Sequence, residues 1–205
     1  MIHQNLKDSY YIFLRPCSLL LRPAYRWHYT RFLGNRRKAH IGCGPNYLSG
    51  FVNIDGNFRR RADYTMDVRA GLPFPDNSLD FIYSCHMLEH LHVDEALKLL
   101  NECRRVLKPS GYVRLTLPDL NYALRILRGE EKSSFPRSFS CADGQAINFL
   151  FCDGQHKYAY TSSLLTEMAL GAGFSKAITT SNRDENLQGM TYSEPGGSFS
   201  VNLFK

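Results

Sequence analysis

Several features that would point to particular protein classes are missing from this chain of 205 residues. Its six cysteines include no C-x-x-C pair or other spacing typical of metal ligands, so we predict free thiols in a reducing compartment. No apolar run approaches the length of a membrane span, and the amino-terminal residues lack the pattern of a signal peptide. The chain has no internal repeat. These absences favour one globular domain, which we expect to be cytoplasmic.

Acidic side chains are almost absent from the first 40 residues. This segment carries eight lysines and arginines and a single acid, Asp8, whereas the rest of the chain carries 17 basic and 18 acidic side chains. The net charge of +6 therefore belongs to an amino-terminal arm, residues 1–37. In residues 9–33 large apolar side chains alternate with arginines, and Pro16 and Pro23 interrupt them. We predict short helical pieces that break at these prolines.

The arm's mixture of arginines and large apolar side chains is typical of a helix that lies on a membrane surface. The same composition is compatible with nucleic acid, but the chain has no nucleic-acid-binding motif, so we expect no such partner. We interpret the arm first as packing its Tyr, Phe and Leu side chains onto the domain. Peripheral contact with the inner face of a membrane is the alternative.

Beyond the arm, strand and helix patterns alternate. We predict strands near 38–42, 51–55, 62–67, 79–84, 111–117, 174–181 and 197–204, and helices near 93–107, 119–128 and 161–171. This order predicts an α/β fold with a doubly wound, mostly parallel sheet and an antiparallel last strand. Only residues 45–50 and 56–62 connect the first three strands, whereas a parallel crossover normally needs a dozen or more. We therefore expect reduced helices after strands 1 and 2, with the arm in their place.

Residues 129–160 follow neither period and are rich in Ser, Gly, Asp and aromatic side chains. A loop of that length in a compact domain is usually functional, or it hides an element. We assign it as an insertion on the substrate side of a domain that spans residues 38–205.

The most informative motif is a glycine turn, His40-Ile41-Gly42-Cys43-Gly44, with Asp55 eleven residues after Gly44 at the end of the next predicted strand. Two glycines let the backbone turn tightly and let a ligand approach it closely. An acid at a strand tip can accept both hydroxyls of a ribose. The pair predicts a nucleoside cofactor. It disfavours a nicotinamide, because Tyr47 stands where G-x-G-x-x-G needs its third glycine.

A second motif, His86-Met87-Leu88-Glu89-His90, matches the H-x-x-E-H signature of some zinc peptidases. A zinc hydrolase that uses His86, Glu89 and His90 is one interpretation. We favour another, in which Glu89 and His90 cap and pack the helix that follows, because His86 comes directly after a strand and the two imidazoles would point differently. We predict no metal site. Asp119, after the fifth predicted strand, is interpreted as a helix cap, with recruitment of a divalent ion as the alternative.

Further segments complete an ordered series. They are Met66-Asp67-Val68, Leu72-Pro73-Phe74-Pro75-Asp76-Asn77-Ser78-Leu79-Asp80, Met87-Leu88-Glu89-His90-Leu91, Arg105-Val106-Leu107-Lys108-Pro109-Ser110-Gly111 and Ala172-Gly173-Phe174. Together with the glycine turn, this series resembles the Rossmann-like, class I S-adenosylmethionine-dependent methyltransferases over roughly residues 38–205. The opening of the domain is similar to that of small predicted bacterial methyltransferases associated with surface-polysaccharide genes.

The resemblance implies S-adenosylmethionine as the cofactor and S-adenosylhomocysteine as the product. It places Gly42, Cys43 and Gly44 at the methionine end, Asp55 at the ribose, Asp67 at the adenine amino group with Val68 beside the ring, and Cys85, His86 and Met87 at the methyl-donor end. His40 stands where many relatives have an acid that serves the cofactor's amino group.

From this resemblance we expect methylation of an oxygen on a small or saccharide-like acceptor, in polysaccharide biosynthesis. A sugar hydroxyl needs help to lose its proton, and His156 and His86 are the candidate bases. The alternative is a non-catalytic nucleoside-binding module of the same fold, which would recruit a partner.

Overall fold

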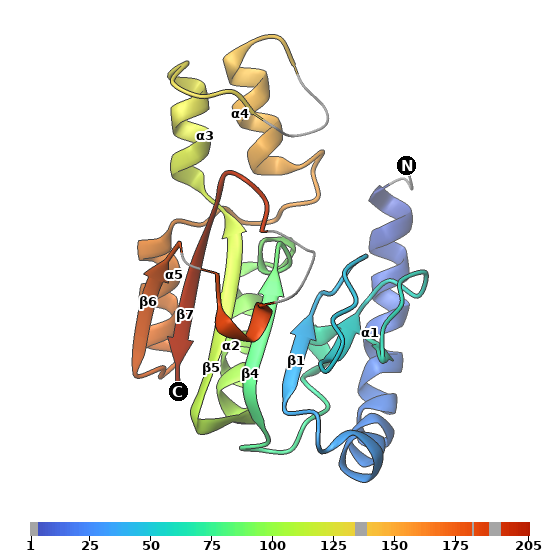
Figure 1. Cartoon of the computed structure of the whole chain (residues 1–205). Coiled ribbons are helices and arrows are strands. Elements are labelled where there is room, and N and C mark those ends of the chain that lie inside the picture. Colours follow the sequence, from blue (N-terminus) through green and yellow to red (C-terminus); the bar gives the residue numbers. More distant parts are fainter. Residues whose placement is uncertain (1–3, 134–138, 182, 189–193) are drawn as a thin grey trace.

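A seven-stranded sheet with the order β3-β2-β1-β4-β5-β7-β6 forms the centre of the computed structural model, which describes residues 4–133, 139–181, 183–188 and 194–205 (Figure 1). The strands are β1 (Lys38–Ile41), β2 (Val52–Asp55), β3 (Tyr64–Thr65), β4 (Leu79–Cys85), β5 (Leu107–Pro118), β6 (Lys176–Thr180) and β7 (Ser198–Phe204). Strand β7 runs antiparallel to β5 and β6, and the remaining pairs are parallel. The predicted Rossmann-like α/β fold is confirmed.

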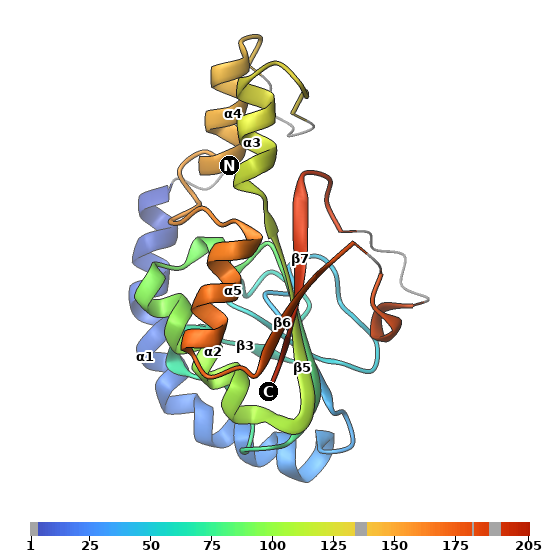
Figure 2. The same cartoon turned by 90° about the vertical axis from the view of Figure 1, so that its left-hand side faces the viewer.

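Helices cover one face of this sheet. The helices are α1 (Gln4–His28), α2 (Val93–Val106), α3 (Leu120–Leu127), α4 (Ala142–Phe151) and α5 (Ser162–Gly171), with short helical turns η1 (Tyr29–Leu33), η2 (Val68–Ala70), η3 (Leu88–His90) and η4 (Glu185–Leu187). Figure 2 shows α1, α2 and α5 on one side of the sheet and loops with η4 on the other. Residues 42–51 and 56–63 form only turns and extended segments. The predicted loss of helices after β1 and β2 is therefore confirmed.

A polar row crosses the face of the sheet that the loops cover. His40 pairs in register with Tyr83, Tyr83 with Arg114, and Arg114 with Asn202. The Arg114 side chain is fully buried, and its Nε and one terminal nitrogen donate to the two carboxylate oxygens of Glu194 at 2.8 and 2.9 Å. A buried guanidinium needs such a partner because desolvation of an unpaired charge is costly.

Helix α4 lies inside the segment that the sequence analysis left irregular. It packs against α3, and Tyr122 and Phe149 bring their ring centroids to 5.0 Å. The two helices form a hairpin beyond the carboxyl end of β5 (Figure 1). The substrate-side role of residues 129–160 stays a prediction.

The arm is one helix, α1, so the prediction of helical pieces broken at Pro16 and Pro23 is wrong. Both prolines lie on the exposed side of α1. A proline removes the hydrogen bond to the carbonyl four residues earlier, and a carbonyl on the exposed side can bond to water instead. Contacts with the domain along the opposite side keep the helix continuous through both positions. Among the described residues, no helix is both long and apolar enough to cross a membrane.

The side of α1 that contacts the domain is polar and aromatic. The hydroxyls of Tyr10 and Tyr25 donate to the carbonyls of Gly56 and Thr65, the Ser18 hydroxyl accepts from the Asp67 backbone N–H at 2.9 Å, and Arg22 donates to the Ala70 carbonyl at 2.9 Å. Just beyond α1, Tyr29 is buried in the main core. The arm thus lies over β2, β3 and η2, where the missing helices would be.

The large apolar side chains of α1 face away from the domain. Ile12 is 70%, Phe13 72% and Leu20 81% exposed. The expectation that the arm packs its tyrosines onto the domain is confirmed, and Leu33 also packs against the core. For the exposed Phe and Leu side chains the same expectation is wrong. Hydrogen bonds at the edge of the sheet, rather than apolar area, decide which side of the helix docks.

Candidate cofactor and acceptor site

The glycine turn closes against β2. The backbone N–H groups of Gly42 and Cys43 both donate to the Ile54 carbonyl, and Gly42 and Gly44 have φ of 69° and 53°. A Cβ at Gly42 would overlap the Met87 side chain, whereas a Cβ at Gly44 would meet no atom within 4 Å. Gly42 therefore permits close packing against Met87, and Gly44 leaves open space over the turn.

Asp55 fastens the end of β2 to this turn. Its Oδ2 accepts from the Gly44 N–H and its Oδ1 from the Asn57 N–H, both at 2.7 Å. The residue is only 9% exposed, which places it deeper than the solvent-facing strand tip that the sequence suggests. A carboxylate offers about four acceptor positions, so about two remain for a ligand hydroxyl.

The end of β4 carries an unusual backbone. His86 has φ of 51°, a left-handed conformation that is uncommon outside glycine and often marks functional positions. Its N–H donates to the Thr116 carbonyl, and its Nε2 lies 2.7 Å from the Ser198 hydroxyl. Burial lowers the pKa of His86 to about 4, so the imidazole is uncharged at neutral pH.

His156 reaches the same region from the loop after α4. Its Nδ1 lies 2.7 Å from the Leu150 carbonyl, and its Nε2 lies 3.8 Å from Oε1 of Glu89. Burial, followed by the nearby His90, lowers the pKa of His156 to about 4. His86 also approaches Glu89, with Nδ1 at 3.9 Å from Oε1. The structure therefore brings both candidate bases next to one buried carboxyl.

Glu89 is the residue whose role the sequence analysis missed. It is 1% exposed, and burial raises the pKa of its carboxyl to about 8. It does not cap the next helix, because Glu95 accepts the His92 N–H at the start of α2 instead. The capping interpretation of Glu89 is therefore wrong, although its packing part holds. The available signal was the H-x-x-E-H pattern, which marks this segment but not its partner His156.

Comparisons with known proteins agree with this geometry. Residues 43–115 match the family model described as a methyltransferase domain. The probable methyltransferase ltbC of Aspergillus luteorubrus is 31% identical over an alignment that covers 35% of this chain and 36% of that protein, so the match spans about a third of the relative's length.

Solved structures show the same fold. An S-adenosylmethionine-dependent methyltransferase from Archaeoglobus fulgidus superposes with a TM-score of 0.53 at 15% identity, covering 90% of this chain and 94% of its own. One from Mesorhizobium loti has a TM-score of 0.53 at 14% identity, with 82% and 90% covered. Residues 43–115 therefore match a methyltransferase domain, and the two solved structures share the fold of this chain. Both solved proteins are methyltransferases that depend on S-adenosylmethionine.

The methionine and ribose end of this methyltransferase domain fits such a cofactor. Gly44 leaves space over the turn, Asp55 keeps acceptor positions beside it, and Cys43 is buried against it. Burial raises the pKa of the Cys43 thiol to about 12, so it acts here as a packed, protonated side chain. These residues suit an uncharged ribose and let the cofactor come close to the backbone of the turn.

The adenine end fits less simply. Asp67 is buried, and the Arg69 Nε and one terminal nitrogen donate to its carboxylate at 2.7 to 3.0 Å. Tyr11 of α1 lies against Gly56, where a Cβ would meet the Tyr11 hydroxyl at 2.9 Å. Burial, followed by the charges of Asp55 and Asp67, raises the pKa of Tyr11 to about 12. The arm therefore lies beside both carboxylates, and the adenine contacts of Asp67 and Val68 stay predictions.

Two other predicted positions have structural partners. His40 is buried, and its ring stacks on Tyr83 with centroids 5.1 Å apart. Its contact with the cofactor's amino group stays a prediction. Asp119 accepts from the Asn121 N–H at 2.9 Å and caps α3, which confirms the capping interpretation.

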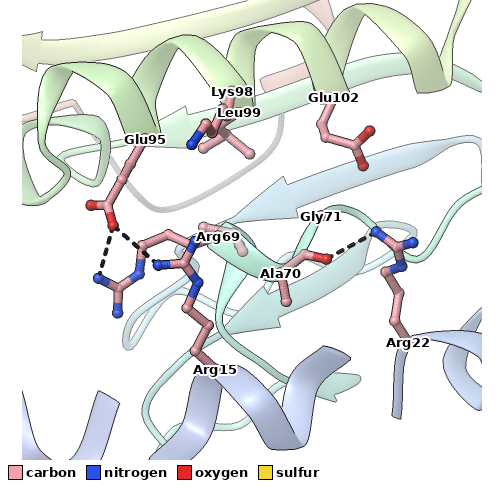
Figure 3. Close-up of a pocket in the computed structure, with 10 residues that line it drawn as sticks. Arg15, Arg22, Arg69, Ala70, Gly71, Glu95, Lys98, Leu99 and Glu102 are labelled. Atoms are coloured by element: carbon pink, nitrogen blue, oxygen red, sulfur yellow. Dashed lines mark hydrogen bonds and ion pairs between the residues drawn. The ribbon is translucent and has the colours of Figure 1, made fainter. Parts of the chain in front are cut away.

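A cavity of about 220 Å³ lies between α1, η2 and α2, beside Arg69 rather than at the glycine turn (Figure 3). Figure 3 shows Glu95 between two guanidinium groups, with Arg15 at 3.5 Å and Arg69 at 3.3 Å. These ion pairs tie the arm to α2 and account for the charges on this wall. The cavity is therefore part of the arm's attachment.

Proposed function

We propose that this protein transfers a methyl group from S-adenosylmethionine to a hydroxyl oxygen of a small, saccharide-like acceptor, as a step in polysaccharide biosynthesis. The observation that carries the proposal is the Gly44–Asp55 hydrogen bond inside the matched methyltransferase domain. The uncharged imidazoles of His86, after β4, and His156, from the loop after α4, supply candidate bases. When bound, the cofactor supplies an electrophilic methyl group on a sulfonium sulfur.

The chain's own residues hold the cofactor and take the proton of the acceptor. The turn from Gly42 to Gly44 and the Asp55 carboxylate hold the cofactor, and the Met87 side chain packs the turn against η3. A hydroxyl must lose its proton as its oxygen attacks, and an uncharged imidazole within reach can take that proton. His156 donates its Nδ1–H to Leu150, so Nε2 is the atom that would accept the proton.

An acceptor screen tests this proposal. The full-length protein is incubated with S-adenosylmethionine and a panel of hydroxylated saccharides and small molecules, and S-adenosylhomocysteine is measured. We expect product with at least one saccharide and none from Asp55→Asn. Cofactor binding without turnover on any acceptor would contradict methyl transfer.

That outcome would favour a non-catalytic module of the same fold, the second candidate. Two contacts support it. Arg69 pairs with the Asp67 carboxylate that the resemblance assigns to adenine, and Tyr11 lies against Gly56, the residue after Asp55. A protein partner that is recovered by pull-down and binds equally with and without the cofactor would then support the non-catalytic module.

We further propose that the outer side of α1 binds an anionic lipid surface and keeps the protein at the cytoplasmic face of a membrane. Exposed Phe13, Leu20 and Trp27 lie on the same helix as the exposed Arg26, and the exposed Arg31 follows in η1. Apolar side chains can insert between acyl chains while arginines contact anionic headgroups.

Vesicle sedimentation tests the membrane proposal. We expect binding to vesicles that contain phosphatidylglycerol, weaker binding at high salt, and little binding to pure phosphatidylcholine. Phe13→Ser with Leu20→Ser should abolish it, whereas Ile147→Ser, which replaces an exposed apolar residue of α4, should not. Equal binding by all variants would contradict the proposal.

A further inference from the structure

In η3, just after β4, the structure buries a carboxyl that has no hydrogen-bond partner among the described residues. Neither carboxylate oxygen of Glu89 has one among the described residues, although the side chain is 1% exposed. An unpartnered buried carboxyl destabilises the fold, so buried polar groups nearly always have a partner or a ligand. The neighbours of Glu89 indicate which ligand it suits.

Backbone carbonyls orient two imidazoles toward this carboxyl. His156 Nδ1 lies 2.7 Å from the Leu150 carbonyl and His90 Nδ1 lies 3.1 Å from the Gln155 carbonyl. Because a carbonyl can only accept, each Nδ1 carries the proton and each Nε2 carries a lone pair. Histidines that bind metal ions usually have this arrangement, which fixes their tautomer and direction.

We propose that Glu89, His90 and His156 form a binding site for one divalent transition-metal ion such as Zn²⁺. One ligand atom from each of the three residues lies within 4.8 Å of the others, and His156 Nε2 is 3.8 Å from Glu89 Oε1. Two ligands of a tetrahedral Zn²⁺ are about 3.4 Å apart, so small side-chain rotations close the site. Two imidazoles and one carboxylate are an established zinc ligand set, which leaves a position open.

The backbone supports this arrangement. The N–H groups of Lys157 and Tyr158 donate to the Glu89 carbonyl at 2.7 and 3.3 Å, which fastens the loop of His156 to η3. His90 is exposed, so the open side of the site faces solvent. The sequence analysis predicted no metal, and its H-x-x-E-H alternative used His86. The site proposed here takes His156 instead, from a distant part of the chain.

The role of the ion rests on the proposed methyl transfer, whereas the site itself does not. With the ion bound, the Nε2 lone pair of His156 is a ligand and no longer the base, so the ion takes over the activation of the acceptor. A hydroxyl oxygen of the acceptor would take the open position, where the cation lowers its pKa and its proton passes to water. The oxygen then forms a bond to the methyl carbon as the carbon–sulfur bond breaks. The electron pair of that bond stays on sulfur, which leaves as a neutral thioether. The substrate class is therefore a hydroxylated acceptor that can coordinate a metal ion.

Calorimetric titration of the full-length, chelator-treated protein with ZnCl₂ tests the site, with MgCl₂ as a comparison and the absorption spectrum of added Co²⁺ as a second readout. We expect saturable binding of a single Zn²⁺ and weak binding of Mg²⁺. We expect the visible absorption bands of bound Co²⁺ to have the intensity typical of a low coordination number. Glu89→Gln, His90→Ala and His156→Ala should each weaken Zn²⁺ binding by about tenfold or more. His92→Ala, which removes an exposed neighbour, should not.

His90→Ala keeps the test decisive because an exposed side chain can be removed without loss of fold. Absence of Zn²⁺ binding, or equal binding by all variants, would overturn the site. The metal site and the methyl transfer can be refuted independently of one another. Zn²⁺ binding without any methylated acceptor would leave the site and contradict the reaction, whereas methylation that persists in chelator would leave the reaction and contradict the role of the ion in it.

Discussion

Replacing Asp55 by alanine should weaken both the fold and the cofactor site. The mutation removes the acceptors of the Gly44 and Asn57 N–H groups, each bound at 2.7 Å to a carboxylate that is only 9% exposed. Hydrogen bonds to a charged group contribute about 1.5–3 kcal/mol each, and partial exposure of the turn reduces this. We expect Asp55→Ala to lower the free energy of unfolding by about 2–4 kcal/mol.

Asp55→Asn separates the two effects. The amide keeps one oxygen and should lose less stability than alanine, yet it places an N–H₂ group where an acceptor is needed for the ribose. Urea unfolding measures the stability of each variant. Titration with S-adenosylmethionine, at a temperature where each variant is still folded, measures cofactor binding. Glu167→Ala, an exposed carboxylate on α5, is the control and should stay within about 0.5 kcal/mol of the parent. Asp55→Ala that matches this control, or that binds the cofactor as the parent does, would refute the reasoning.

Four further outcomes are expected. Burial lowers the pKa of His40 to about 4. Between pH 6.5 and 4 the unfolded chain therefore binds a proton that the folded chain does not, so the free energy of unfolding falls as the pH falls through that window. In urea unfolding measured against pH, His40→Phe should remove about 2–3 kcal/mol of this loss. Tyr29→Ala should cost about 3 kcal/mol, and removal of residues 1–33 should give an unfolded or aggregating protein by circular dichroism and light scattering, because Tyr29 belongs to the core. Glu194→Ala should cost about 3 kcal/mol in urea unfolding by removing the carboxylate that pairs with the buried Arg114 guanidinium, whereas no loss would contradict a stabilising role for this pair. His156→Ala should lower turnover more than cofactor affinity, and unchanged turnover would limit His156 to loop structure.

The regular elements could be predicted because each carries its own signal. Apolar positions repeat along α2, and the seven strands are bounded by glycines, prolines and polar residues. Helix α4 carries no comparable signal, since Gly144 and Asn148 interrupt the apolar pattern of its sequence. Its stability depends on packing against α3. A single-sequence pattern contains no information about such a partner.

The orientation of the arm could not be predicted for a related reason. Apolar side chains usually face the domain, but here the docking side is chosen by Ser18, Tyr10 and Tyr25, whose hydroxyls meet backbone groups at the edge of the sheet. In the candidate site, the motifs placed Asp55 at the end of β2 and His86 directly after β4, where the structure has them. They could not show that Arg69 pairs with Asp67 or that His156 reaches Glu89, because both depend on tertiary contacts.

Titration of the full-length protein with S-adenosylmethionine by calorimetry tests the central claim most directly, with S-adenosylhomocysteine and NAD as comparisons. The account predicts micromolar binding of the first two ligands and none of NAD, with Asp55→Asn strongly weakened. Absence of binding by S-adenosylmethionine and S-adenosylhomocysteine would contradict it. The Arg69–Asp67 pair and Tyr11 would then close the site, and the methyltransferase domain would serve another purpose.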